Sequence, residues 1–156
     1  MNPIFEKIRT LEERDDLVGE VDILIDALYQ NSNQGLDAIL KNKVRAWVSE
    51  IINNEITKEG VEVESYLKKL KADLLSLGDI KLVLAFEPTD SFIDRISTFF
   101  RKNIDQNMVL DISYNPGILG GCVVIYKGKY KDLSLKRIYE EEFAKIRQEL
   151  FLQLSD

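Results

Sequence analysis

The spacing of apolar residues changes near Gly78, and this change constrains the fold more than any other feature of the 156-residue sequence. Before Gly78, apolar residues recur every three or four positions, which is the period of an α-helix with one buried face. After Gly78, short apolar runs rich in β-forming residues appear between amphipathic stretches. The sequence therefore predicts a helical region over residues 1–78 and a mixed α+β region over residues 79–156.

Signals for helix starts and stops divide the first region. The segment from Thr10 to Glu13 has the pattern of a capping box, in which the Thr and Glu side chains accept hydrogen bonds from each other's backbone amides. Gly60 is a natural helix stop, because glycine readily adopts the left-handed conformation that ends many helices. The predicted elements are a helix from Pro3 with Asn2 as its N-cap, a second helix from Thr10, a turn at residues 31–35, one long helix from Leu36 toward Gly60 and a further helix at about residues 62–77.

The second region alternates between strand and helix signals. The run from Leu119 to Tyr126 is almost wholly apolar, which is typical of a strand in the middle of a sheet. The order β-α-β-β-β-α predicts a two-layer α+β domain with a small four-stranded sheet. The predicted elements are a strand at residues 80–86, a helix from Thr89 or Asp90 to about Asn103, strands at residues 108–114, 119–126 and 130–132, and a last helix from about Ser134.

Composition excludes several classes of site. The chain has no histidine, which excludes Ser-His-Asp and Cys-His nucleophiles and histidine-based metal centres. Its single cysteine, Cys122, excludes a disulfide framework within one chain. The formal net charge of −6 argues against nucleic-acid binding, which needs clustered positive charge. No apolar run approaches the roughly 20 residues that span a bilayer, and the N-terminus lacks signal-peptide order. We therefore expect a soluble, cytoplasmic protein with no cofactor.

Two features of the second region leave a phosphate-binding role open. Gly120-Gly121 precedes the most apolar strand, and lysines alternate through the hairpin at residues 127–131. The spacing differs from that of a P-loop, because Gly128-Lys129 is followed by Tyr130 in place of Ser or Thr. The alternatives are a small cytoplasmic enzyme that acts on a phosphorylated ligand, or glycines that allow a bulge or a close contact at the start of a strand.

The segment around the last helix carries two further candidates. Asp132 and Ser134 are interpreted as helix-capping residues, with Asp132 as the N-cap and Ser134 in the first turn, since Ser134 has no activating base in a chain without histidine. The end of this helix has more apolar residues than one helix face needs, so these residues either close the protein's own core or dock a partner. The candidates for partner docking are Ile146, Leu150, Phe151 and Leu154.

Three pieces of the second region carry a resemblance. They are Ala85-Phe86-Glu87-Pro88 at the end of a strand, the turn from Asn115 to Gly121 before an apolar strand, and Lys131-Asp132-Leu133-Ser134-Leu135 before the last helix. Together they resemble the C-terminal domain of the ATP synthase δ subunit family, the bacterial counterpart of the oligomycin-sensitivity-conferring protein. The match covers roughly residues 80–139. Its motif residues are Pro116, Gly117, Gly120, Gly121, Asp132 and Ser134.

The δ resemblance implies a function without catalysis. It implies a non-catalytic peripheral-stalk, or stator, subunit of a proton-translocating ATP synthase, which links the C-terminal helices of the b subunits to the catalytic head and so couples proton flow to ATP synthesis. It also implies contact with the N-terminus of the α subunit, and a peripheral position at the cytoplasmic face of the cell membrane, reached only through the complex. A second resemblance, of residues 143–151 to the V- and A-type ATPase E subunit, implies the same class of stalk function.

The δ resemblance also sets an expectation for the first region. The usual δ chain begins with a six-helix bundle that holds the N-terminal tails of the α subunits. Residues 1–78 leave room for about three helices of ordinary length. We therefore expect a shortened helical bundle before the α+β region.

Overall fold

The computed structural model describes residues 3–29 and 36–153, and within them the side chains of all residues except 3, 37 and 148–153. Seven α-helices and a four-stranded sheet lie in these ranges, which confirms the α+β class. The chain divides into two compact units, Met1–Gly78 and Asp79–Asp156, and each is described by itself. The turn expected at residues 31–35 and the helix cap expected at Asn2 lie outside the described residues.

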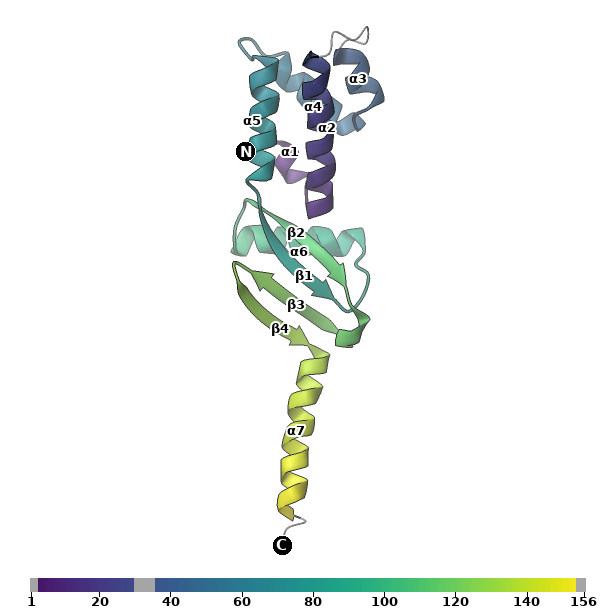
Figure 1. Cartoon of the computed structure of the whole chain (residues 1–156), viewed down its shortest axis with the longest axis vertical. Coiled ribbons are helices and arrows are strands. Elements are labelled where there is room, and N and C mark those ends of the chain that lie inside the picture. The colour runs from purple at the N-terminus through teal and green to yellow at the C-terminus, as the bar shows by residue number, and fades with distance from the viewer. Residues whose placement is uncertain (1–2, 30–35, 154–156) are drawn as a thin grey trace. The chain divides into compact units, whose positions relative to one another are not determined.

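The first unit is helical (Figure 1). Helix α2 packs against α5 and α3, and the short α1 and α3 both contact α4. Five helices are described: three of ordinary length, as the length of the region allows, and the short α1 and α3, which are only 4 and 7 residues long. The elements are α1 (Pro3–Glu6), α2 (Leu11–Tyr29), α3 (Leu36–Asn42), α4 (Ala46–Ile56) and α5 (Val63–Leu75).

Apolar side chains on the facing sides of α2 and α5 form the centre of this unit. They recur at the predicted helical spacing, so each helix turns one continuous apolar face inward. Their burial is nearly complete, with at most 2% of each residue exposed to solvent. The residues are Leu17, Val21 and Leu24 of α2 and Leu67, Leu70 and Leu74 of α5.

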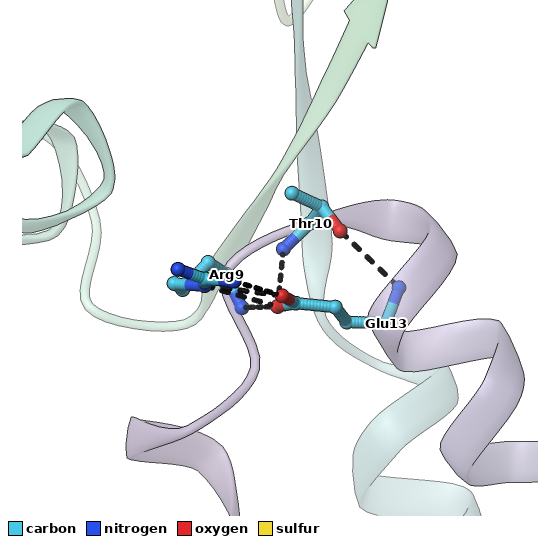
Figure 2. A network of polar contacts seen from close by, with 3 residues as sticks. All are labelled: Arg9, Thr10 and Glu13. Atoms are coloured by element: carbon cyan, nitrogen blue, oxygen red, sulfur yellow. Dashed lines mark hydrogen bonds and ion pairs between the residues drawn. The ribbon is translucent and has the colours of Figure 1, made fainter. Parts of the chain in front are cut away.

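The predicted capping box at the start of α2 is confirmed (Figure 2). The Thr10 hydroxyl accepts a hydrogen bond from the Glu13 amide at 3.2 Å, and the Glu13 carboxylate accepts one from the Thr10 amide at 3.3 Å. Arg9 adds an ion pair, with Nη2 2.5 Å from Glu13 Oε1. Burial alone would raise the pKa of Glu13, but the hydrogen bonds and charge of Arg9 outweigh burial and lower it.

The single long helix predicted from Leu36 toward Gly60 is wrong, because the chain breaks into α3 and α4 at Arg45. Arg45 has extended backbone angles, φ −56° and ψ 139°, and its amide donates to Glu20 Oε1 of α2 at 2.9 Å. Its guanidinium also binds Glu20, with Nε–Oε1 and Nη2–Oε2 distances of 2.9 and 3.0 Å. Glu20 thus satisfies the backbone group that a continuous helix would have paired, and this tertiary contact stabilises the break.

The second unit contains the sheet. Its strand order is β2-β1-β3-β4, so β3 has a neighbour on each side, as its apolar sequence predicted. Strand β3 is antiparallel to β1 and β4, whereas β1 and β2 point the same way in Figure 1. The elements are β1 (Gly78–Leu84), α6 (Asp90–Asn103), β2 (Met108–Tyr114), the 3₁₀ turn η1 (Pro116–Ile118), β3 (Gly121–Tyr126), β4 (Lys129–Ser134) and α7 (Leu135–Gln153).

The two faces of the sheet have different partners. One face packs against α6 through an apolar cluster (Figure 1). Val83 of β1 lies opposite Val123 of β3, and both point to the other face, since neighbouring residues of a strand alternate between faces. The unit is therefore a two-layer α+β fold in which α6 covers one side. The core cluster on that side consists of Ile80, Leu82, Phe100, Met108 and Leu110.

The predicted hairpin between the last two strands is confirmed, but β4 is longer than expected. Lys127 and Gly128 have φ values of 47° and 74°, as a two-residue hairpin turn with left-handed central residues requires. Pairing continues beyond Asp132 to the Ser134–Gly121 pair. Strand β4 therefore runs directly into α7 without a loop, and this junction sets the position of α7.

Candidate docking surface

The turn before β3 is fixed by the motif residues at its start. Pro116 is the first residue of the 3₁₀ turn η1. An amide at this position has no partner within the turn, so the lack of an amide hydrogen in proline costs no hydrogen bond. The Asn115 side chain accepts a hydrogen bond from the Gly117 amide at 2.9 Å. Leu119 closes the turn in a left-handed conformation, with φ 64°. These contacts fix the path of the chain up to Gly120, which directly precedes β3.

Gly120 and Gly121 allow the end of β4 and the start of α7 to approach the backbone closely. A Cβ atom at Gly120 would lie 2.5 Å from Leu135 Cδ1, and one at Gly121 would lie 2.2 Å from the Leu133 carbonyl oxygen. Gly121 also has φ +77°, which favours glycine. The Leu135 amide donates to the Gly120 carbonyl oxygen at 2.9 Å, so the first residue of α7 is tied to this site.

The atoms around Gly120 and Gly121 are relevant to the choice between phosphate binding and close packing. The space at Gly120 is filled by the Leu135 side chain and that at Gly121 by the backbone of β4. The glycines therefore serve the close packing between β3, β4 and α7, which was the structural interpretation of the pair.

Ser134, rather than Asp132, caps α7, so the predicted assignment of Asp132 as N-cap is wrong. Ser134 directly precedes the helix, and its hydroxyl accepts a hydrogen bond from the Arg137 amide at 3.3 Å. Asp132 lies within β4, and its Oδ1 accepts from the Ser134 amide at 2.8 Å. Hydrogen bonds from Ser134 lower the pKa of Asp132. The cap shifted by two residues because β4 pairing continues to Ser134.

Helix α7 presents an exposed apolar stripe. Every residue from Leu135 to Arg147 is exposed, although the apolar side chains recur at helical spacing. Figure 1 shows the helix running on from β4, away from the sheet. Contact with η1 and β4 holds its first turns. We call these residues the α7 stripe: Leu135, Ile138, Tyr139, Phe143 and Ile146, with exposed fractions of 43%, 49%, 52%, 63% and 47%.

The structure describes only part of the predicted docking set. Ile146 belongs to the α7 stripe. The side chains of Leu150 and Phe151 lie outside the described side chains, although their backbone is part of α7. Leu154 lies outside the described residues. The earlier residues of the α7 stripe were predicted to lie on the last helix but were not among the docking candidates. Helical spacing alone does not distinguish an inward from an outward apolar face.

A hollow of about 340 Å³ lies beside the first turns of α7, on the sheet face opposite α6. Val83, Ile118, Val123 and Ile125 give it apolar walls. The polar part of its lining comes from Asn115 before η1, from β4 and from the first turns of α7. The hollow was not predicted from the sequence, although the alternation of β3 places Val123 and Ile125 on one face. The remaining lining residues are Asn115, Tyr130, Asp132, Ser134, Lys136, Arg137 and Glu140.

Comparison with known proteins places this architecture in a family. The sequence model described as "ATP synthase delta (OSCP) subunit" matches residues 24–141. Similar curated proteins are the ATP synthase subunit delta of Lactococcus lactis subsp. cremoris (strain MG1363), 29% identical over 128 residues, and that of Lactococcus lactis subsp. lactis (strain IL1403), 30% identical over 128 residues. Each match covers 81% of this chain and 66% of the relative.

A third relative is more distant. The ATP synthase subunit delta of Hydrogenobaculum sp. (strain Y04AAS1) is 22% identical over 125 residues, which cover 80% of this chain and 65% of the relative. The chain thus spans just under two thirds of the length of these relatives. The family match begins within α2, so it includes most of the helical unit as well as the motif residues around β3 and α7. The chain belongs to the ATP synthase delta (OSCP) subunit family.

Proposed function

We propose that this chain is a non-catalytic peripheral-stalk subunit that ties the C-terminal helices of the b subunits to the catalytic head of a proton-translocating ATP synthase. Family membership supports the stalk role. The observation that carries the docking role is the α7 stripe, since apolar residues exposed along one helix face favour association with another helix. In this role the chain would couple proton flow to ATP synthesis by resisting torque.

The strength of such docking follows from the burial it would bring. Complete burial of a side chain such as Ile or Phe contributes about 1.5–3 kcal/mol relative to full exposure. The five side chains of the α7 stripe are about half exposed, so each could still gain roughly half of that on docking. The partner helix would bury a similar apolar area, so the two sides together contribute about 8–15 kcal/mol before the entropy cost of association, which suits a dissociation constant of tens of micromolar for a single helix.

The first turn of α7 is held by several contacts, as a subunit that transmits force through this helix requires. The Ser134 cap, the hydrogen bond from the Leu135 amide to Gly120, and the Leu135 side chain against Gly120 all act within the first turn. Because these contacts fix the start of the helix, a load applied along the α7 stripe would pass into β3 and β4. For this reason we propose that the b helices bind at α7.

The helical unit is the proposed contact for the N-terminus of the α subunit. The family match extends into this unit from residue 24, which supports a role for it in the complex. No described helix is long and apolar enough to cross a membrane. We propose that the chain reaches the cytoplasmic face of the membrane through its partners. A synthetic peptide of the α N-terminus titrated into the chain should broaden or shift NMR signals of α2 and α5.

Titration calorimetry with a peptide from the C-terminus of the b subunit tests the main proposal. The full chain should bind the peptide, and Phe143→Ser should weaken binding about tenfold, because the most exposed apolar side chain of the α7 stripe is lost. Phe99→Ser is the matched control: Phe99 is a phenylalanine of α6 with a similar exposed fraction, 59%. That variant should bind the peptide like the unchanged chain.

Two outcomes would count against the proposal. One is the absence of any binding at peptide concentrations of tens of micromolar. The other is an equal loss of affinity in the Phe143 and Phe99 variants, which would show that the α7 stripe is not the docking surface.

A further inference from the structure

Strand β4 is an edge of the sheet with an open backbone. The strand order β2-β1-β3-β4 places no strand beyond β4 in the described part of the chain. Alternate residues of an antiparallel pair exchange both backbone hydrogen bonds. The Leu135 amide donates to the Gly120 carbonyl oxygen at 2.9 Å, so every second residue of β4, counted back from Leu135, bonds to β3. The N–H and C=O groups of Tyr130 and Asp132 therefore point away from β3, to the free side of β4.

The open edge is short. Ser134 is the next residue whose amide points away from β3, and Asp132 Oδ1 already accepts a hydrogen bond from it at 2.8 Å. The hairpin turn at Lys127 and Gly128 ends the edge on the other side. The edge thus has room for an extended segment of about five residues, which would form about four backbone hydrogen bonds with Tyr130 and Asp132.

Lysines make this edge positive. Lys129 and Lys131 are exposed, and among the described residues neither forms an ion pair. They are two positions apart on one strand, so both side chains are on the same face. The chain as a whole has a net charge of −6, and the other edge strand, β2, contains Asp111 and no cation. The β4 edge is therefore the sheet edge that attracts an acidic strand.

The same charges disfavour a second copy of the chain as the partner. Antiparallel pairing of two β4 edges about Tyr130 would place Lys129 of each copy opposite Lys131 of the other. Pairing about Lys131 would place two lysines opposite each other, and pairing about Asp132 would place two carboxylates opposite each other. Like charges in directly opposite positions destabilise a strand pair. Lysines on an edge strand thus oppose pairing between copies, and they leave an acidic strand as the favoured partner.

We propose that β4 binds an extended acidic segment of a partner protein as an added strand. Two acidic residues of the segment, two positions apart, lie opposite Lys129 and Lys131. The residue between them exchanges backbone hydrogen bonds with Tyr130. The lysines then occupy the positions without mutual backbone bonds, where opposing side chains are closest.

The hollow in the sheet face suggests the nature of the middle residue. Tyr130 lies on the face that carries the hollow, next to the apolar side chain of Ile125. A residue opposite Tyr130 points to this same face, so an apolar side chain suits it. The pattern that β4 would recognise is therefore acidic, apolar, acidic.

An NMR titration of the full chain with the peptide Thr-Glu-Val-Glu-Thr, acetylated and amidated at its ends, tests the proposal. The amide signals of Tyr130 and Asp132 should shift, and their hydrogen exchange should slow, because both amides gain acceptors. The double variant Lys129→Glu/Lys131→Glu should raise the dissociation constant at least tenfold, because two attractive cross-strand pairs become repulsive. A peptide with lysine in place of both glutamates should bind the unchanged chain at least tenfold more weakly.

Two controls separate strand addition from general charge attraction. Lys41→Glu/Lys43→Glu changes two exposed lysines with the same spacing in the other unit, and it should leave the affinity unchanged. A peptide with N-methylated valine keeps every charge but lacks the amide that would donate to Tyr130, so its binding should be lost. This second control leaves the protein itself unaltered.

Three outcomes would overturn the proposal. They are the absence of binding at about 1 mM peptide, equal binding of the N-methylated peptide, and an equal loss of affinity in both double lysine variants. The stalk role is tested separately, because the b peptide is proposed to bind at α7. Failure of b-peptide binding would leave strand addition at β4 standing, and failure of strand addition would leave the stalk role standing.

Discussion

Glycine has opposite effects at two positions of this chain. Gly19 lies within α2, and a Cβ atom there would meet nothing within 4 Å. Gly121 has a left-handed backbone at the start of β3, against the carbonyl of Leu133. The first glycine weakens a helix by its backbone entropy, whereas the second allows two strands and a helix to meet. The residue type alone does not distinguish these two effects. The local backbone conformation and the neighbouring atoms distinguish them.

Substitution of Gly121 by alanine should destabilise the second unit strongly. Left-handed strain costs about 1–2 kcal/mol, and the 2.2 Å approach to the Leu133 oxygen forces a further backbone shift, so we expect a loss of about 3 kcal/mol. Gly19→Ala should instead stabilise the first unit by up to about 1 kcal/mol. Urea unfolding measures both changes. A Gly121→Ala chain as stable as the original would contradict the close approach.

The Glu13 ion pair should make part of the stability depend on pH. Its pKa is lowered from an ordinary value of 4.5, so the contribution is present above that value and is lost as pH falls through the lower folded pKa. Glu13→Gln keeps the capping hydrogen bond but removes the charge paired with Arg9. We expect it to cost about 1 kcal/mol at neutral pH and progressively less below about pH 4.

Chemical unfolding at several pH values measures this difference. Glu12→Gln, at an exposed neighbouring position, should show little change at any pH. A penalty for Glu13→Gln that stays constant into strong acid would contradict the paired carboxylate.

At the scale of elements, the boundary between α3 and α4 depends on a contact distant in sequence. Both helices lie within one stretch of helical apolar spacing, and neither proline nor glycine separates them. The break occurs at Arg45 because Glu20 of α2 accepts hydrogen bonds from its amide and its guanidinium. Removing the acceptor leaves a backbone amide and a cation without this partner.

We expect Glu20→Ala to reduce the unfolding free energy by about 2 kcal/mol, because the Glu20 side chain is only 13% exposed and its hydrogen bonds are charge-assisted. Glu50→Ala, at an exposed position of α4, is the matched control and should change stability by less than about 0.5 kcal/mol. Thermal unfolding followed by circular dichroism distinguishes the two. Equal effects of both substitutions would show that the Glu20 contact does not stabilise the break.

At the scale of the whole molecule, each of the two units has an apolar core among its described residues. Apolar residues of α2 and α5 fill the first unit, and the cluster between the sheet and α6 fills the second. Leu24 and Leu82, each fully buried, belong to these two cores. Each core is formed by residues of one unit, so each unit has its own source of hydrophobic stabilisation.

We therefore expect core substitutions to act mainly on their own unit. Leu82→Ala should lower the stability of the second unit by about 3 kcal/mol through lost burial and an added cavity. Leu24→Ala should do the same in the first unit. Hydrogen exchange measured by mass spectrometry reports both, because slowly exchanging amides follow the stability of their own unit. Equal loss of protection in both units from either substitution would contradict separate cores.

The sequence by itself determined most of the local structure. Residue spacing and turn chemistry were sufficient for the capping box at Thr10–Glu13, the helix Asp90–Asn103, the strand Met108–Tyr114, the central place of β3 and the hairpin at Lys127–Gly128. These features arise from periodicity, propensity and hydrogen bonds between near neighbours in the chain. The three motif pieces at residues 85–88, 115–121 and 131–135 were together also sufficient to predict the family.

Tertiary structure alone decided the remaining features. The break at Arg45 depends on Glu20, 25 residues earlier, and the cap at Ser134 depends on how far β4 continues to pair with β3. The outward orientation of the α7 stripe depends on which surfaces the rest of the unit already covers. Apolar spacing defines a face on a helix, but only the packing of distant residues determines whether that face is buried within the chain or left to a partner.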